Sequence, residues 1–227
     1  MRLSSLLTTL LSYMLSATAA QASCRLSDWA SEDSSGKLQI TSISDTMDII
    51  SPDGLSLWYK KRLTGNYEIS YRVKVITGDG TYDRLSDLNC FWGADDPEYP
   101  DDFFARSNWR KGVFQNYNTL NLYYVGYGGN ENSTTRFRAY HGEYYMVDDT
   151  KNKPVIKEYT DESHLLKPDM WYAIRIRVAN GMTTFNINGE ELFRLSIKDE
   201  EGDGYFALRL WKNHVCFTDF QVKYLDN

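Results

Sequence analysis

Residues suited to chemistry gather in one predicted strand near the middle of the chain, residues 134–141. Because side chains alternate along a strand, Arg136, Arg138 and Tyr140 are expected on one face, with neighbours about 7 Å apart. The opposite face carries Phe137 and suits a core. Two guanidinium groups beside a phenol suit an anionic, hydroxyl-rich ligand. His141, which follows directly, adds a candidate acid or base.

A second predicted strand, residues 84–92, brings Asp87 and Asn89 to a common face. Asp87 offers a carboxylate and Asn89 an amide to a ligand. A structural interpretation stands beside this one, because both side chains could instead tie down the long loop that follows. Arg136 could likewise form an ion pair with Asp87 across neighbouring strands.

Aromatic and polar side chains near these strands are expected to complete a binding surface. Tyr123 and Tyr127 are expected to face the ligand, whereas Tyr124 is in phase with apolar positions and could belong to the core. His214 could be a turn residue, and His141 a core or edge residue. The remaining binding candidates, with His214, are Trp92, Asn130, Arg209 and Trp211.

Short strands separated by turns make up most of the sequence. Two Asn-Gly pairs, at residues 180–181 and 188–189, are the clearest hairpin signals. Residues 67–76 and 171–178 alternate between apolar and charged positions, and residues 51–54 predict a turn that contains Pro and Gly. No stretch keeps a helical period. The expected fold class is therefore all-β, an antiparallel sandwich of two sheets.

The longest irregular segment, residues 93–118, is expected to form one wall of a cleft. Its four aromatic residues favour a packed loop, with a short helix near residues 103–109. The acidic residues at 95–102 and 199–203 could hold Ca²⁺. Neither group has a full set of ligand spacings, so we expect solvated acidic loops and no metal. No His/Cys cluster predicts zinc.

The N-terminus predicts a signal peptide at residues 1–22, with a basic start, a short apolar stretch and an Ala-x-Ala cleavage site. The apolar stretch is too short to span a membrane. One domain, residues 23–227, would then be exported to the periplasm, the exterior or the cell surface. Surface attachment would follow if Cys24 is lipidated. Cys90 and Cys216 are expected to be buried free thiols rather than a disulfide.

The composition narrows the possible partners. The formal net charge is −6, so nucleic acid is not an expected partner. No later segment could cross a membrane, and we expect a monomer. The 17 tyrosines suit stacking on sugars, although tyrosine is also an ordinary residue of β-sheets.

The last third of the chain resembles the concanavalin A-like lectin/glucanase superfamily, through residues 171–178, 185–190, 204–211 and 217–222. The central stretch resembles a narrower group of exported bacterial proteins associated with polysaccharide breakdown, through residues 86–92, 123–130 and 134–138. The resemblance implies a jelly roll whose concave sheet carries the ligand cleft. Members of the superfamily are glycosidases, polysaccharide lyases or lectins, so the fold alone does not choose among them.

Hydrolysis would need two carboxyl groups that flank the scissile bond. The hydrolases of the superfamily carry them on one strand as E-x-D-x-x-E, a motif that this sequence lacks. Asp87 would therefore need a second carboxylate from a loop, such as Glu143, Asp95 or Asp96. A binding module without chemistry is the other alternative, since aromatic rings and arginines alone could hold an acidic glycan.

Elimination from a uronate needs a group that neutralises the carboxylate, a base and an acid. Arg136, Arg138 and Asn89 are candidates for the first role, and Tyr140 and His141 for the others. Tyr124 and His214 are further candidates for proton transfer. We therefore expect an Arg/Tyr-lined concave cleft for an acidic polysaccharide, with a polysaccharide lyase as the favoured function.

Overall fold

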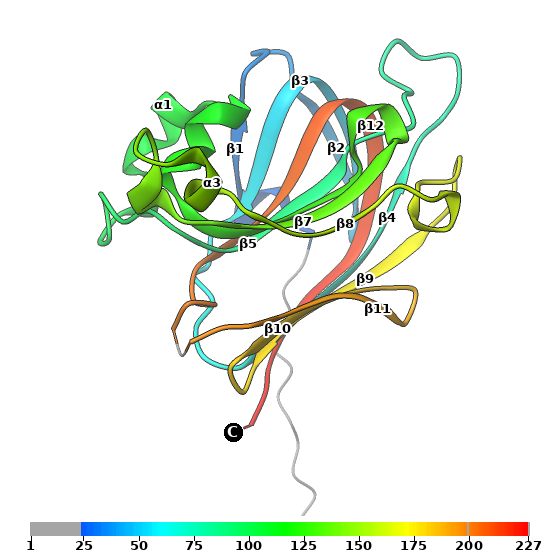
Figure 1. Cartoon of the computed structure of the whole chain (residues 1–227). Helices are drawn as coiled ribbons and strands as arrows, with labels where there is room; N and C mark the ends of the chain where they lie inside the picture. The colour runs from blue at the N-terminus through cyan, green and yellow to red at the C-terminus, as the bar shows by residue number, and fades with distance from the viewer. Residues whose placement is uncertain (1–23, 199, 227) are drawn as a thin grey trace, which may run out of the picture.

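A computed structural model describes residues 24–198 and 200–226; the predicted signal peptide lies outside the described residues. Antiparallel strands form two stacked sheets (Figure 1). The predicted all-β jelly-roll sandwich is therefore confirmed. Two long strands, β3 (Thr46–Tyr59) and β12 (Tyr205–Tyr224), pair with each other and run from one sheet into the other.

The sheet that carries the cleft is called the front sheet here, and its partner the back sheet. Along the front sheet the order is β1, the second half of β3, the first half of β12, then β5, β6, β7 and β8. The bounds are β1 (Trp29–Asp33), β5 (Leu88–Asp95), β6 (Asn121–Gly128), β7 (Thr134–Tyr140) and β8 (Val155–Tyr159).

The back sheet begins with β2, the first half of β3 and the second half of β12, and continues with β4, β9, β10 and β11. The bounds are β2 (Gln39–Ile43), β4 (Tyr67–Val75), β9 (Tyr172–Ala179), β10 (Met182–Ile187) and β11 (Glu190–Ser196). Strands β4 and β9 alternate between buried and outward residues, as predicted. Both Asn-Gly pairs form hairpin turns with positive φ at each residue, which suits the twist of paired strands.

The long strands bend where they change sheets. On β12 the pairing is irregular between Trp211 and Asn213, and Lys212 between them has a φ of 49°. On β3 the bend lies between Ser51 and Gly54, which both stay paired with β12. The prediction of a turn at residues 51–54 is wrong. β3 pairs with β12 both before and after the bend, so the chain continues in the same strand and does not reverse.

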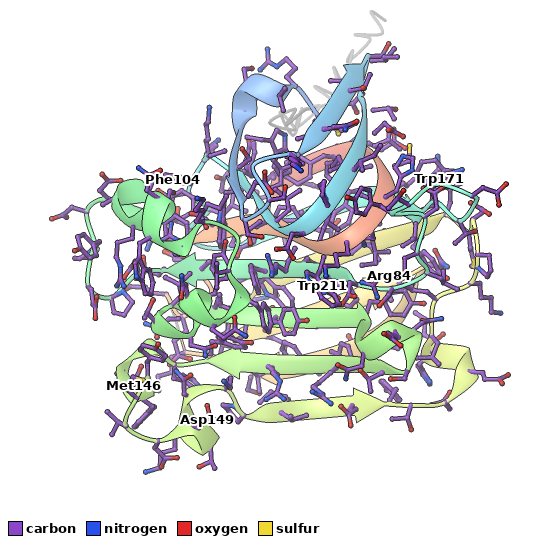
Figure 2. The ribbon with its side chains drawn as sticks, turned by 90° about the horizontal axis from the view of Figure 1, so that it is seen from above. Arg84, Phe104, Met146, Asp149, Trp171 and Trp211 are labelled. Atoms are coloured by element: carbon purple, nitrogen blue, oxygen red, sulfur yellow. The ribbon has the colours of Figure 1, made fainter. Side chains whose placement is uncertain are left out.

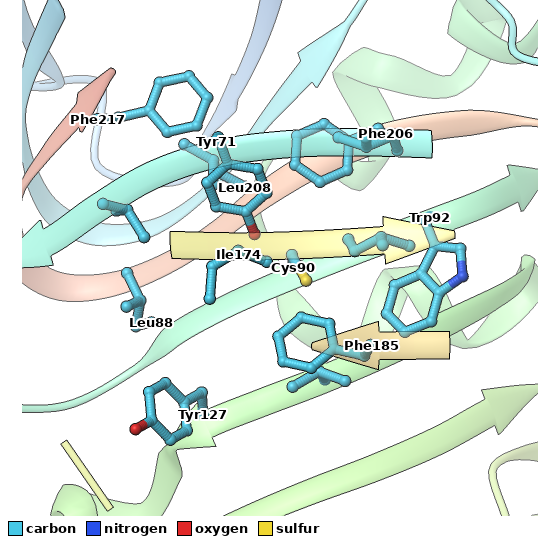
Figure 3. Packing of buried hydrophobic residues seen from close by; sticks show 14 of the residues in the cluster. Tyr71, Leu88, Cys90, Trp92, Tyr127, Ile174, Phe185, Phe206, Leu208 and Phe217 are labelled. Atoms are coloured by element: carbon cyan, nitrogen blue, oxygen red, sulfur yellow. The ribbon is translucent and has the colours of Figure 1, made fainter. Parts of the chain in front are cut away.

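The core lies between the two sheets and is rich in aromatic rings (Figure 3). The Trp92 ring lies nearly parallel to that of Phe137, with centroids 5.6 Å apart, and 6.1 Å from that of Phe185. Its Nε1 donates to Thr183 Oγ1 at 2.8 Å, so the polar atom is satisfied inside the core. Truncating such a ring typically costs about 3–5 kcal/mol.

Short helical turns occupy the loops, and several gather beside the front sheet (Figure 1). The helix predicted near residues 103–109 is confirmed as two consecutive turns, η2 and α1. No helix in the described part of the chain is long and apolar enough to cross a membrane. The turns are η1 (Leu26–Asp28), η2 (Phe103–Arg106), α1 (Ser107–Arg110), η3 (Phe114–Thr119), α2 (Gly129–Asn132), η4 (Gly142–Tyr144), α3 (Asp149–Asn152) and η5 (Glu162–His164).

Candidate functional site

A cleft of about 820 Å³ lies on the outer face of the front sheet. Its floor comes from β5, β6, β7 and β12. The turn at α2 lies on one side, and residues 112–118, called the cleft wall here, lie on another. Eight of the thirteen predicted site residues line it: Asp87, Asn89, Asn130, Arg136, Arg138, Tyr140, Arg209 and Trp211.

The cleft wall is anchored by a buried ion-pair network that the sequence did not reveal. Arg110, which is 0% exposed, places Nη2 2.9 Å from Glu32 Oε1 on β1 and Nη1 3.2 Å from Asp96 Oδ2. Tyr117 donates to Glu32 Oε2 at 2.6 Å. Glu32 and Arg110 are 78 residues apart, so no spacing pattern could pair them. The aromatic residues of the segment 93–118 predicted that it would be packed, but they did not indicate which residues it packs against.

Two glycines let the wall touch the sheet directly. A Cβ atom on Gly112 would lie 2.2 Å from the carbonyl oxygen of Gly54 on β3. Gly112 also has a φ of 73°, which favours glycine. Its carbonyl oxygen accepts a hydrogen bond of 2.9 Å from Arg209 Nη1. The wall is therefore fixed to the cleft floor through backbone contact.

The arginines of β7 point into the cleft as predicted, and both have partners. Arg136 forms an ion pair with Glu158 on β8, not with Asp87 as one interpretation had it. Arg138 donates to the carbonyl oxygen of Lys153. Lys153 also lines the cleft, and its Nζ lies 3.0 Å from Asp149 Oδ1.

Asp87 lies at the edge of the cleft in a network of its own. Its Oδ2 accepts from Arg84 Nη2 and from Ser86 Oγ, each at 2.7 Å, and its Oδ1 accepts from Asn89 Nδ2 at 3.3 Å. Arg84 also stacks on Trp211, with the guanidinium carbon 4.9 Å from the ring centroid (Figure 2). Asp87 therefore helps to hold the segment before β5, and not the loop at residues 93–118 that the structural interpretation had it tie down.

Two tyrosines lie together on the cleft floor. Tyr124 on β6 and Tyr140 on β7 meet edge to face, with ring centroids 6.1 Å apart. Neither hydroxyl has a hydrogen-bond partner among the described residues. Burial raises the pKa of Tyr140 to about 12, although Arg138 and Arg209 oppose the shift. Burial also raises the pKa of Tyr124.

Three aromatic residues predicted to face the ligand lie in the core instead. Trp92, Tyr123 and Tyr127 are 0%, 7% and 4% exposed and belong to the cluster between the sheets. Tyr124 lines the cleft, so the predicted phase of β6 is reversed. The cause is the cleft wall. It covers Leu122 on the outer face of β6, so that β6 carries apolar residues on both faces and its alternation is ambiguous.

The two predicted histidines do not line the cleft. His141 follows β7 on the core-facing phase, and its backbone pairs with Asn152. His214 lies between two carboxylates, with Nδ1 2.8 Å from Asp83 Oδ1 and Nε2 3.0 Å from Asp48 Oδ2. Burial opposes protonation of His214, but these carboxylates outweigh it and raise the pKa above its ordinary value.

Several of the acidic residues considered for Ca²⁺ have protein partners. Asp95 pairs with Arg62, and the Asp102 side chain caps the turn that begins at Phe103. Within residues 24–198 and 200–226, no group of three or more His, Cys, Asp and Glu side chains could hold a metal ion. The cysteines in this part of the chain, Cys24, Cys90 and Cys216, are all free thiols. Cys90 is buried as predicted, but Cys216 is only partly buried, because it alternates with the core residues Val215 and Phe217 on β12.

The fold is a jelly roll of the kind found in galectin-like proteins, carbohydrate-binding modules and glucanases. The chain belongs to the family described as a domain of unknown function, DUF6250, whose model matches residues 49–220. A comparison of the sequence with curated proteins found no match.

Solved structures share the fold at low sequence identity. A Bacillus subtilis protein of unknown function with a galectin-like fold superposes with a TM-score of 0.66 at 16% identity, over 88% of this chain and 90% of that one. The carbohydrate-binding module CBM66 from Bacillus subtilis gives 0.53 at 10%, over 86% and 95%. The endo-β-1,3-glucanase from Pyrococcus furiosus gives 0.54 at 13%, over 88% and 89%. These likenesses establish the fold.

Proposed function

We propose that this chain is an exported carbohydrate-active protein whose cleft binds an acidic polysaccharide and cleaves it by β-elimination. Proteins of the same fold include a carbohydrate-binding module and a glucanase, which supports a glycan as the ligand. The acidic character is our inference from the cations that line the cleft: Arg136, Arg138, Lys153 and Arg209.

The observation that carries the proposed reaction is the pair of unpartnered hydroxyls on Tyr124 and Tyr140. In β-elimination, a base removes the proton on the carbon next to the carboxylate. The electron pair forms a carbon–carbon double bond, and the glycosidic oxygen leaves with a proton from an acid. Positioned tyrosines can fill both proton-transfer roles when a cation stabilises the charge that develops on the carboxylate.

The carboxylates that line the cleft support hydrolysis less well than the tyrosines support β-elimination. Hydrolysis needs one carboxyl group that donates a proton and a second that attacks or activates water. Asp87 is already held by Arg84 and Ser86. Asp53 accepts a hydrogen bond of 3.0 Å from Trp211 Nε1. Both carboxylates already have hydrogen-bond partners within the protein. Glu131, the third carboxylate that lines the cleft, has none among the described residues, but one free carboxyl group cannot fill both roles.

A binding module without chemistry is the second candidate. The observation in its favour is the raised pKa of Tyr140, which leaves very little phenolate to act as a base near neutral pH. In that case the tyrosines would serve only as hydrogen-bonding and stacking groups for the glycan.

Export remains a proposal that rests on the predicted signal peptide. Attachment to the surface through Cys24 is disfavoured by the fold. Cys24 is 0% exposed and its backbone N–H donates to Asp45 Oδ1 at 2.8 Å. A lipid on this thiol would require Cys24 to leave the core.

A panel of uronate-containing polysaccharides tests the function. Elimination creates unsaturated chain ends that absorb in the ultraviolet, so a rise in absorbance on one substrate supports the lyase. New reducing ends without that absorbance would support a hydrolase. Retention on an acidic polysaccharide column without either product would support a binding module. Failure to bind or cleave any acidic glycan would contradict the proposal.

A further inference from the structure

The arginine on the cleft floor has an unusual charge environment. Arg209 on β12 is 4% exposed and lines the cleft. Among the described residues, its side chain donates one hydrogen bond, to the carbonyl oxygen of Gly112, and forms no ion pair with a carboxylate. By contrast, Arg136 at the same cleft is neutralised by Glu158. A buried cation without a counter-charge is costly, so the position favours an anion from outside the chain.

The surroundings of the guanidinium leave part of it available to a ligand. Its carbon lies 5.2 Å from the ring centroid of Phe114 and 5.6 Å from that of Tyr117. Nη1 is used by Gly112, which leaves the donors on Nε and Nη2 without a protein acceptor among the described residues. Burial lowers the pKa of Arg209, while Tyr117, Tyr124 and Asp87 oppose that shift. The group remains a cation at neutral pH because arginine loses its proton only at far higher pH.

A second unpartnered polar group lies directly beside this arginine. Asn89 is paired with Arg209 in the register of β5 and β12, and both line the cleft. Asn89 is 5% exposed. Its Nδ2 donates to Asp87 Oδ1, but its buried Oδ1 has no hydrogen-bond partner in the described structure. An acceptor left in this way costs free energy unless a ligand supplies a donor.

We propose that Arg209 and Asn89 form the position that binds one uronic acid residue, with the carboxylate on Arg209 and a ring hydroxyl on Asn89 Oδ1. This inference rests on the proposed function and adds which residues select an acidic sugar. A planar carboxylate can accept two parallel hydrogen bonds from one guanidinium. The same site places the carboxylate beside Tyr124 and Tyr140. The arginines of β7 then serve neighbouring sugars along the chain.

The test compares an oligouronate with its carboxyl-reduced, neutral counterpart by titration calorimetry. Each protein carries Tyr140→Phe, so that the chain stays intact during the titration. Arg209→Met removes the charge, and Asn89→Asp gives Arg209 an internal carboxylate that competes with the ligand. Arg194→Met is the matched control, because Arg194 is an exposed arginine on β11 that pairs with Glu191. Melting temperatures show which variants keep the fold.

We expect the Tyr140→Phe protein, alone or with Arg194→Met, to bind the acidic chain more tightly than the neutral chain, by roughly tenfold or more. Arg209→Met and Asn89→Asp should lose that preference. If Arg209→Met fails to fold, Asn89→Asp alone decides the question, since it adds no volume. An unchanged preference in folded variants would overturn the inference while leaving the proposed function intact. Equal binding of both chains by the protein that carries Tyr140→Phe alone would overturn the carboxylate site but not glycan binding. No binding of either chain would contradict the proposed function itself.

Discussion

Tyr124 and Tyr140 pack edge to face on the cleft floor, with ring centroids 6.1 Å apart, and neither hydroxyl is hydrogen-bonded to another residue in the part of the chain that the structure describes. They come from neighbouring strands, since Tyr124 is paired with Arg138 and Leu122 with Tyr140 in the register of β6 and β7. The antiparallel ladder thus holds both phenols on one face, and Phe114 of the cleft wall packs against Tyr124, with ring centroids 5.5 Å apart. A rigid pair of this kind can give a proton and take one within a single binding site.

The proposed chemistry predicts a rate that rises with pH. The pKa of Tyr140 is about 12, so only the small phenolate fraction could act as a base at neutral pH. Below the pKa this fraction grows about tenfold with each pH unit, and the cleavage rate at low substrate should follow it. The measurement is initial rate against pH from neutral to mildly alkaline conditions. A rate that falls over this range would rule out a phenolate base.

Gly112 should be intolerant of any side chain. Gly112→Ala places Cβ 2.2 Å from Gly54 O, whereas the same change at Gly36 meets no atom within 4 Å. Both glycines have positive φ, at 73° and 64°, so each variant bears the conformational cost of about 1–2 kcal/mol. The difference between the two variants isolates the clash at the wall. Urea unfolding should show a larger loss for Gly112→Ala, and equal losses would refute the close contact.

The buried network under the wall should dominate its stability. Arg110→Met leaves Glu32 and Asp96 buried without a counter-charge, which typically costs about 3–5 kcal/mol. The control is Arg194→Met, which breaks an exposed pair with Glu191 and should cost at most about 1 kcal/mol. Chemical unfolding measures both. Similar small losses would show that the network does not anchor the wall.

His214 should stabilise the fold on the acid side of neutrality. Asp83 and Asp48 raise its pKa in the folded state, against the opposing effect of burial, above the ordinary value of 6.5. Its contribution is therefore complete below 6.5 and is lost as the pH rises through the folded-state value. The free energy of unfolding of the wild type minus that of His214→Gln should decrease with rising pH. A difference that increases with pH would contradict the two carboxylate contacts.

The alternation of β7 was enough to predict one side of the cleft. Arg136, Arg138 and Tyr140 share the outward face, and Phe137 faces the core. The same reasoning failed at β6, because the cleft wall buries the outer face as well. Apolar residues therefore lie on both faces of β6, and the alternation does not show which face lines the cleft. The prediction that Tyr123 contacts the ligand is wrong, because Tyr123 lies in the core and Tyr124 faces the cleft.

Long-range contacts set the other limit on what the sequence could predict. The pairing of Arg110 with Glu32 joins a loop to the first strand, and no local pattern encodes it. The bend at Pro52 was predicted as a turn because its composition suits one. Pairing of β3 with β12 on both sides of the bend overrides that local preference.

The most direct test of the central claim is the ultraviolet absorbance of a uronate polysaccharide incubated with wild type, Tyr140→Phe or Tyr124→Phe. Each variant removes one hydroxyl and keeps the ring, so the packing of the floor is preserved. We predict a rise in absorbance for the wild type and a rate at least about a hundredfold lower for Tyr140→Phe, with oligouronate binding retained. Wild-type cleavage that is unchanged in both variants would contradict the assignment of the tyrosines to proton transfer.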